Sequence, residues 1–222
     1  MEVRDGSLTE RQKQVLDAAL GLLVEAGVGL TMTSVARRAS CSKETLYKWF
    51  GDRDGLLTAT VQWQAARVRI APLERGRIDA ASLASTLERF AADWLAVISG
   101  DVSVALNRLA IGHPAAEGSE RNLGAIVLEN GPFAMGRRLK PALELGREAG
   151  ILAFDDADEA FRTFFGLVVR DAQIRLLLGE RVKLTTLDIG EHAGRATRQF
   201  FVLYGAADAG AQGDREIETS KG

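Results

Sequence analysis

The spacing of apolar residues is the feature that most restricts how this chain can fold. Apolar residues recur every three to four positions along most of the sequence, and no segment shows the alternation of apolar and polar residues typical of a half-buried β strand. Near the N-terminus, for example, Val15, Ala19 and Leu22 fall on one stripe of a helix. The periodicity therefore predicts an all-α fold.

Capping residues, glycines and prolines divide the chain into about nine to ten helices. Thr9 and Gln12 form a capping box for the first helix, Asp52 caps the fourth, and Pro72 ends it. We expect helices at 9–26, 33–39, 42–50, 52–70, 79–98, 102–112, 117–129, 132–149, 156–178 and 184–204. This order predicts a compact N-terminal unit of three helices, a connecting helix and a larger helical bundle.

The expected helices group into two domains and a tail. We assign 9–54 to the N-terminal domain, 55–205 to the larger domain and 206–222 to a disordered tail. The tail is small, polar and acidic, and Ile217 is its single large apolar residue, so it has too little apolar surface to form a core.

Composition is that of an ordinary soluble protein. Apolar residues make up 46% of the 222 residues, enough for a substantial core. The N-terminus lacks a basic and apolar signal segment, and no apolar run approaches about 18 residues, so we expect a cytoplasmic protein that does not enter a membrane. The single cysteine, Cys41, excludes an internal disulfide and a cysteine-based metal cluster. We expect neither a metal nor a cofactor.

Charge is balanced over the whole chain but positive in one short stretch. The net charge of −2 argues against a protein coated in nucleic acid and still allows a small basic patch. Residues 36–53 contain five basic and two acidic residues, which gives this stretch a local charge of +3. It holds most of the two short helices, joined by Ala39-Ser40-Cys41.

Two short helices joined by a tight turn have the layout of a helix-turn-helix, whose second helix enters the major groove of DNA. At about 100° per residue, Leu46 and Phe50 point to the same side of this helix, and we expect both in the core. The opposite side holds Glu44, Thr45 and Lys48, with Tyr47 and Trp49 at its edges. Such a face suits phosphates and base edges, but an ordinary solvated helix has the same composition, and spacing alone leaves both interpretations open.

The same stretch and the helix after it carry a longer motif. In chain order it consists of Thr33, Ala36, Ala39, Ser42, Thr45-Leu46-Tyr47, Phe50, Arg53 and Leu56-Leu57. This motif resembles the DNA-binding domain of the tetracycline-repressor (TetR) family of transcriptional regulators, over about residues 9–60. Three positions depart from the family pattern: Ser40 replaces a usual glycine, Arg53 replaces a usual lysine, and Trp49 stands where His, Tyr or Phe is common. Ser40 is strained only if the turn requires a positive φ.

The resemblance implies which residues meet DNA. Phosphate contacts fall on Thr33, Ser42, Thr45, Tyr47, Lys48 and Arg53, base-facing positions on Lys43, Glu44 and Lys48, and Trp49 faces DNA beside them. Two recognition helices on one face of DNA must sit about 34–36 Å apart or a multiple of it. The expected partners are therefore a second copy of the chain and a palindromic, double-stranded operator.

The resemblance also implies a small-molecule effector, apolar or amphipathic, in the larger domain. Residues 113–152 are similar to the C-terminal domain of an AefR-like branch of the family. Candidate effector-binding residues, which could equally be ordinary core, are Trp63, Phe90, Trp94, Asn107, His113, Phe133 and Met135. Family members dimerise through their last two helices, for which the candidates are Phe161, Phe165, Val168, Ala172, Gly190, Ala193, Gly194 and Thr197.

An enzyme and a protein-interaction module are the two other classes of function. An enzyme would need a catalytic or metal-binding set of residues, whereas the chain has only two histidines, His113 and His192, and no phosphate-binding loop. A helical protein-interaction module without DNA specificity is the alternative that stays open. The sequence predicts a homodimeric repressor, not an enzyme, that is released from its operator by an effector.

Overall fold

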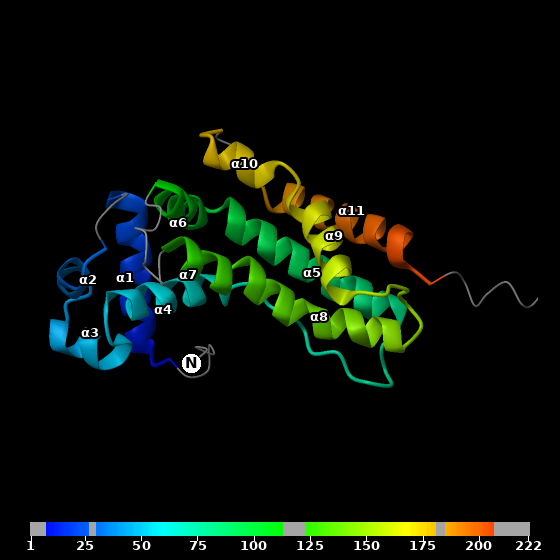
Figure 1. Ribbon diagram of the computed structural model, residues 1–222, viewed down its shortest axis with the longest axis horizontal. Coiled ribbons are helices and arrows are strands. Elements are labelled where there is room, and N and C mark those ends of the chain that lie inside the picture. Colours follow the sequence, from blue (N-terminus) through cyan, green and yellow to red (C-terminus); the bar gives the residue numbers. More distant parts are fainter. Residues whose placement is uncertain (1–7, 27–29, 113–122, 181–184, 207–222) are drawn as a thin grey trace, which may run out of the picture.

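The computed structural model describes residues 8–26, 30–112, 123–180 and 185–206 (Figure 1). Its helices are α1 (Glu10–Ala26), α2 (Met32–Arg38), α3 (Lys43–Phe50), α4 (Arg53–Ala65), α5 (Ala80–Ser99), α6 (Asp101–Gly112), α7 (Leu123–Asn130), α8 (Pro132–Glu148), α9 (Ala157–Val169), α10 (Ala172–Leu177) and α11 (Thr186–Tyr204). Within the described residues no strand forms beyond one isolated antiparallel bridge, between Leu152 and Gly205. The predicted all-α fold is confirmed.

The helices form two hydrophobic cores. The N-terminal core joins the apolar faces of α1–α4 to Leu106 of α6 and Ile126 of α7. The C-terminal core combines α5, α8, α9 and α11 around Phe90, Phe164 and Phe200, which are fully buried. Figure 1 shows α1–α4 together at one end of the molecule, with α5 and α8 running along its length. Helices α6 and α7 therefore fasten the larger bundle to the N-terminal unit.

Helix α4 is shorter than predicted. It ends at Ala65 rather than near Ile70. The amides of Arg67 and Val68 donate to carbonyls only three residues earlier, and the Val68 side chain is buried in the C-terminal core. The amide of Arg69 then donates to the Asp93 carboxylate on α5 at 3.1 Å, a bond that replaces continuation of the helix. The single helix predicted before Pro72 is thus a helix and a packed turn.

The helix predicted at 156–178 is two helices. Arg170 has φ +45°, in the left-handed region, and separates α9 from α10. The end of α10 is held by α6, since the guanidinium of Arg108 donates to the carbonyls of Leu176 at 2.8 Å and Leu177 at 3.1 Å. Periodicity alone does not reveal this break, because both halves keep helical spacing.

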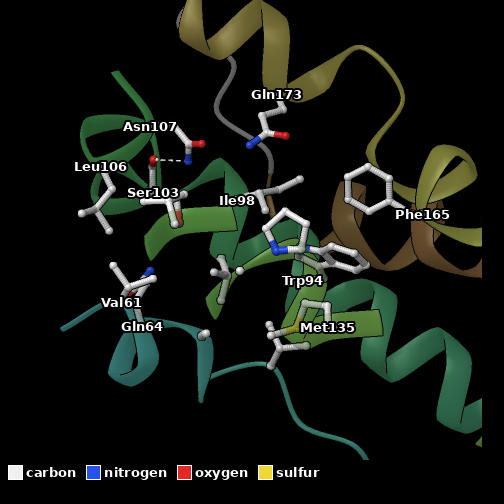
Figure 2. Close-up of a pocket in the computed structure, with 16 residues that line it drawn as sticks. Val61, Gln64, Trp94, Ile98, Ser103, Leu106, Asn107, Met135, Phe165 and Gln173 are labelled. Carbon is white, nitrogen blue, oxygen red and sulfur yellow. Dashed lines mark hydrogen bonds between the residues drawn. The ribbon is translucent and has the colours of Figure 1, made fainter. Parts of the chain in front are cut away.

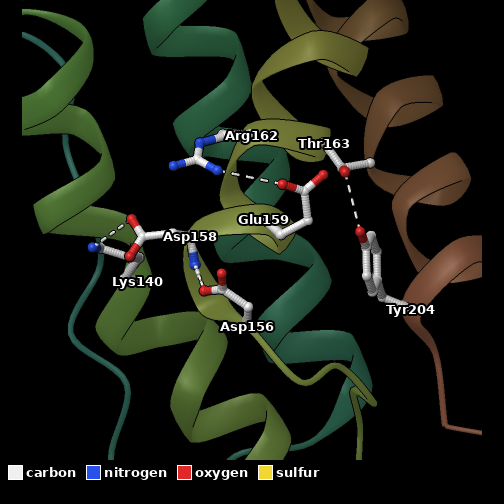
Figure 3. A network of polar contacts seen from close by, with 7 residues as sticks. All are labelled: Lys140, Asp156, Asp158, Glu159, Arg162, Thr163 and Tyr204. Atoms are coloured by element: carbon white, nitrogen blue, oxygen red, sulfur yellow. Dashed lines mark hydrogen bonds and ion pairs between the residues drawn. The ribbon is translucent and has the colours of Figure 1, made fainter.

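Helix α9 is fixed to its neighbours by polar contacts (Figure 3). Lys140 Nζ of α8 lies 2.8 Å from the Asp158 carboxylate, and this contact lowers the pKa of Asp158. Thr163 Oγ1 lies 3.0 Å from the hydroxyl of Tyr204 on α11. These contacts join three helices of the C-terminal core along their polar edges.

Several predictions lie partly outside the described residues. These are the start of the helix at 117–129, His113 and most of the tail from Ala206; Ala206 itself donates its amide to Ile151 at 3.0 Å. In the part of the chain that the structure describes, no single helix is long and apolar enough to span a membrane. The bent pair α5–α6 reaches that length and composition only together, across a 61° bend.

Candidate functional site

Hydroxyl caps begin both helices of the helix-turn-helix. Thr31 Oγ1 accepts the amide of Ser34 at 3.0 Å and starts α2, so this helix begins before the predicted Thr33. Ser42 Oγ accepts the amide of Thr45 at 3.2 Å and lies 3.1 Å from Thr45 Oγ1. The Ser42 and Thr45 hydroxyls, both predicted phosphate contacts, are therefore held together at the N-terminus of α3.

The turn between α2 and α3 contains a strained residue. Ser40 has φ +49°, the positive value that favours glycine. The guanidinium of Arg11 on α1 donates to the carbonyls of Ala39 at 2.6 Å and Ser40 at 2.9 Å, and so holds the turn in place. Arg11 was missed at the level of sequence because its partners lie 28 and 29 residues away.

We expect Ser40→Gly to raise the free energy of unfolding by about 1 kcal/mol, because glycine adopts a positive φ without a Cβ clash. Urea denaturation followed by circular dichroism measures the change. Ser40→Ala is the matched control, since alanine keeps the Cβ and should give no gain. An equal gain in both variants would show that the backbone conformation is not the cause.

Helix α3 presents four of the predicted DNA-facing side chains to solvent: Lys43, Glu44, Tyr47 and Lys48. On the opposite side Leu46 is fully buried in the N-terminal core, as predicted. Trp49 and Phe50 are half-buried and pack edge to face, with ring centroids 6.2 Å apart. Trp49 thus serves the core in part, and the exposed face of α3 is narrower than the predicted set.

The charges around α3 are not all available to a ligand. Hydrogen bonds from its own backbone amide and from Ser42 lower the pKa of the Glu44 carboxyl, which favours an acceptor-only carboxylate. Arg53 Nε donates to the Leu30 carbonyl at 2.9 Å, so this predicted phosphate contact also binds the backbone just before α2. Arg38 forms a bidentate pair with Glu25 at 2.6 and 2.8 Å, which removes part of the local positive charge.

A cavity of about 80 Å³ lies where α4 meets the larger bundle (Figure 2). Its walls come from seven helices, α4–α10, and from the turns after α4 and before α8. Of the predicted effector-binding residues, Trp94, Asn107 and Met135 line it. Val61 and Leu106 line it too and also belong to the N-terminal core, so one set of side chains serves both.

The other candidate effector-binding residues lie elsewhere. Phe90 is buried in the C-terminal core and packs against Trp94, with ring centroids 5.4 Å apart. Trp63 donates its indole N–H to Asp17 on α1 at 2.8 Å and fastens α4 to that helix. Phe133 is 54% exposed in a surface groove between α8 and α9. His113 is outside the described residues.

Gln64 is one of the cavity residues that sequence reasoning missed. Its side chain is on α4, 6% exposed, and in the described part of the chain its Oε1 has no hydrogen-bond partner. Glutamine inside a short amphipathic helix carries no sequence signal for such a position. Buried polar atoms normally have partners, so this atom points to a partner that the described residues do not supply.

The last helices use many of the predicted dimer residues inside one chain. Val168, Ala193 and Thr197 are buried in the bundle, and a Cβ at Gly194 would lie 3.2 Å from Glu88 of α5, so these small residues let α11 approach α5. Phe161 is nearly buried, whereas Phe165, Ala172 and Gly190 are half-buried. Val202 and Leu203 of α11 are large apolar residues that stay exposed, at 85% and 60%, and the prediction did not include them.

Two known domains match this chain. Residues 15–60 match the family described as "Bacterial regulatory proteins, tetR family", and residues 85–206 match "AefR-like transcriptional repressor, C-terminal domain". A TetR transcriptional regulator from Agrobacterium tumefaciens is 48% identical, with 90% of this chain and 96% of that one covered and a TM-score of 0.75. The flavonoid-responsive regulator FrrA is 27% identical over 89% of this chain and 98% of its own, with a TM-score of 0.64.

Curated relatives match only the N-terminal part. The HTH-type transcriptional regulator BetI of Paraburkholderia phytofirmans is 42% identical over 66 residues, which are 27% of this chain and 34% of that protein. BetI of Burkholderia cenocepacia is 47% identical over 53 residues, 23% of this chain and 27% of its own length. The match spans about a third of these relatives or less, and it covers the helix-turn-helix rather than the cavity.

Proposed function

Because this chain belongs to the tetR family of bacterial transcriptional regulators, we propose that it is a homodimeric, ligand-responsive repressor that leaves its operator when a small effector binds. The family consists of transcriptional regulators with a helix-turn-helix, a class without catalytic activity. Four parts of this proposal go beyond family membership: the repressor role, the effector response, the dimer and a cytoplasmic location.

The exposed face of α3 is the observation that carries the DNA-binding proposal. The solvent-facing side chains of α3 include two amines, on Lys43 and Lys48, and one phenol, on Tyr47. Leu46 anchors the helix in the core beneath them. Lysine and tyrosine donate to phosphate oxygens, and lysine also reads guanine edges. The Glu44 carboxylate can accept from a cytosine amino group but would repel a phosphate, so we assign it to a base.

The walls of the cavity support the effector response. Val61 of α4 and Leu106 of α6 pack in the N-terminal core and also line the cavity, so a ligand that moves them disturbs the packing beneath α3. A ligand shifts the equilibrium only if it binds the two conformations with different affinities. We propose that the effector favours a position of α4 in which the two α3 helices no longer fit adjacent major grooves.

Exposed apolar residues support a dimer through α9 and α11. Val202 and Leu203 would otherwise stay in water, and Phe165 and Gly190 remain partly accessible. A symmetric pair of these faces would build a four-helix interface and place two α3 helices on one DNA duplex.

Selection of bound DNA from random sequence tests the proposal in one experiment. The expected product is a palindrome whose half-sites are one turn apart, about 34–36 Å, or a multiple of it. Recovery of one half-site would contradict the dimer. Recovery of no preferred sequence would favour the protein-interaction module instead.

We expect Lys48→Ala to weaken operator binding roughly tenfold and to flatten the dependence of log K on log salt concentration by about one unit, because one phosphate-contacting cation is lost. Titration of labelled operator at several salt concentrations measures both quantities. Lys140→Ala is the matched control, since Lys140 lies on α8 and pairs with Asp158. An unchanged slope for the Lys48 variant would remove this residue from the phosphate contacts.

A further inference from the structure

From the chemistry of the cavity walls, we infer that the effector is an electrically neutral molecule with one small apolar ring or short chain and a hydroxyl group, and that Gln64 binds this hydroxyl. This inference rests on the proposed ligand response and deepens it. It names the class of effector and the residue that selects it.

The walls favour a neutral ligand. The sixteen described residues that line the cavity include no Asp, Glu, Lys, Arg or His; the polar ones are Gln64, Ser103, Asn107 and Gln173. An ionised group placed there would lose its hydration without an opposite charge to replace it. The guanidinium of Arg138, which is not among these residues, donates to the backbone carbonyl of Ala65 at 2.9 Å.

Gln64 favours a hydroxyl. Its Oε1 is buried without a partner among the described residues, whereas the Asn107 amide already donates to the Ser103 carbonyl at 2.8 Å, as Figure 2 shows. The two ends of a glutamine amide are nearly equal in shape and can exchange places. A hydroxyl both donates and accepts, so it satisfies whichever end faces the cavity. A ketone or ether could only accept and would leave Oε1 unpaired.

The size and shape of the cavity limit the apolar part. The ring of Trp94 packs against α9, 6.0 Å from the stacked ring of Phe161 and 4.8 Å from Phe165. The volume of about 80 Å³ is smaller than the roughly 150 Å³ that admits benzene in an engineered cavity. One ring can enter only if flexible side chains such as Met135 move, and a polycyclic molecule would require the helices to separate.

Calorimetric titration of the full chain with three matched probes tests this inference. The probes are 4-ethylphenol, 4-ethyltoluene and 4-ethylbenzoate, which share one substituted ring and differ in the polar group. At pH 7 a phenol is neutral, whereas the benzoate is charged. We expect 4-ethylphenol to bind about tenfold more tightly than either of the others, the ratio that one buried hydrogen bond supplies.

Gln64→Met keeps the length of the side chain and removes its amide. In this variant 4-ethylphenol and 4-ethyltoluene should bind with equal affinity, and Gln64→Leu gives the same comparison if the methionine variant folds poorly. A tenfold preference for the phenol that survives in the variant would overturn the role of Gln64. Tight binding of 4-ethylbenzoate, or no binding of 4-ethylphenol at millimolar concentration, would overturn the neutral class.

Operator binding measured with and without 4-ethylphenol separates this inference from the proposed function. If the phenol binds and operator affinity stays unchanged, the ligand class stands and the ligand response fails. If a charged compound releases the operator and the phenol does not bind, the response stands and the ligand class fails.

Discussion

Replacing Leu46 by alanine is expected to lower the free energy of unfolding by about 2–5 kcal/mol. Leu46 is fully buried between α3 and the rest of the N-terminal core. Truncation removes three buried carbon atoms and leaves a cavity whose walls cannot fully collapse, because α3 is held at both ends by Ser42 and the turn at Gly51. Urea denaturation at one protein concentration measures the loss, since the stability of a dimer depends on concentration.

Lys48→Ala is the natural comparison for this measurement. Lys48 lies two residues further along the same helix and is exposed, so its truncation should change the free energy of unfolding by no more than about 0.5 kcal/mol. The two variants should therefore separate folding from DNA binding. Equal losses of stability would contradict the division of α3 into a buried and an exposed face.

Local patterns were sufficient to predict most of the fold. The capping box of Thr9 and Gln12 and the cap at Asp52 act on neighbouring residues, so they can be recognised in the sequence, and the helices they begin are present. The end of α4 and the break at Arg170 could not be found in this way. The first depends on a partner in a distant helix, Asp93, and the second on the left-handed φ of Arg170, a residue type that does not signal such a conformation.

The candidate site likewise has one part that the sequence predicts, the face of α3, and one part that it does not, the cavity. The face of α3 follows from helical angles, because Leu46 is buried and Lys48 is exposed as the 100° spacing predicts. The cavity does not follow from angles. The sequence candidates were mostly aromatic, and two of them, Trp63 and Phe90, pack elsewhere. The Oε1 of Gln64, which has no partner among the described residues, becomes visible only when the helices around the cavity are in place.

Small residues on α11 show a second limit of sequence reasoning. A run of glycine, alanine and threonine indicates close helix approach without indicating which helix approaches. Here Ala193, Gly194 and Thr197 are buried within the same chain, with Gly194 close to Glu88 of α5, so the proposed dimer face of α11 would use residues on its other side, including Val202.

Gly55→Ala is expected to lower the free energy of unfolding by about 3 kcal/mol or more and to abolish operator binding. Gly55 lies in the first turn of α4, where its amide donates to the capping carboxylate of Asp52 at 2.7 Å. A Cβ at this position would overlap the backbone carbonyl oxygen of Phe50, well inside the 3.0 Å that real Cβ contacts keep. Because that oxygen belongs to the backbone at the end of α3, relief requires α3 and α4 to move apart.

Gly21→Ala on α1 is the matched control for this prediction. An added Cβ there would meet only the flexible Arg38 side chain, at an ordinary 3.7 Å, so helix propensity should raise the free energy of unfolding by about 0.5–1 kcal/mol. Denaturation and operator titration of both variants compare the same added methyl group at two positions. There is space for it at Gly21 and none at Gly55. If Gly55→Ala folded with unchanged stability and still bound its operator, the close approach of α3 to α4 would not determine how α3 is presented to DNA.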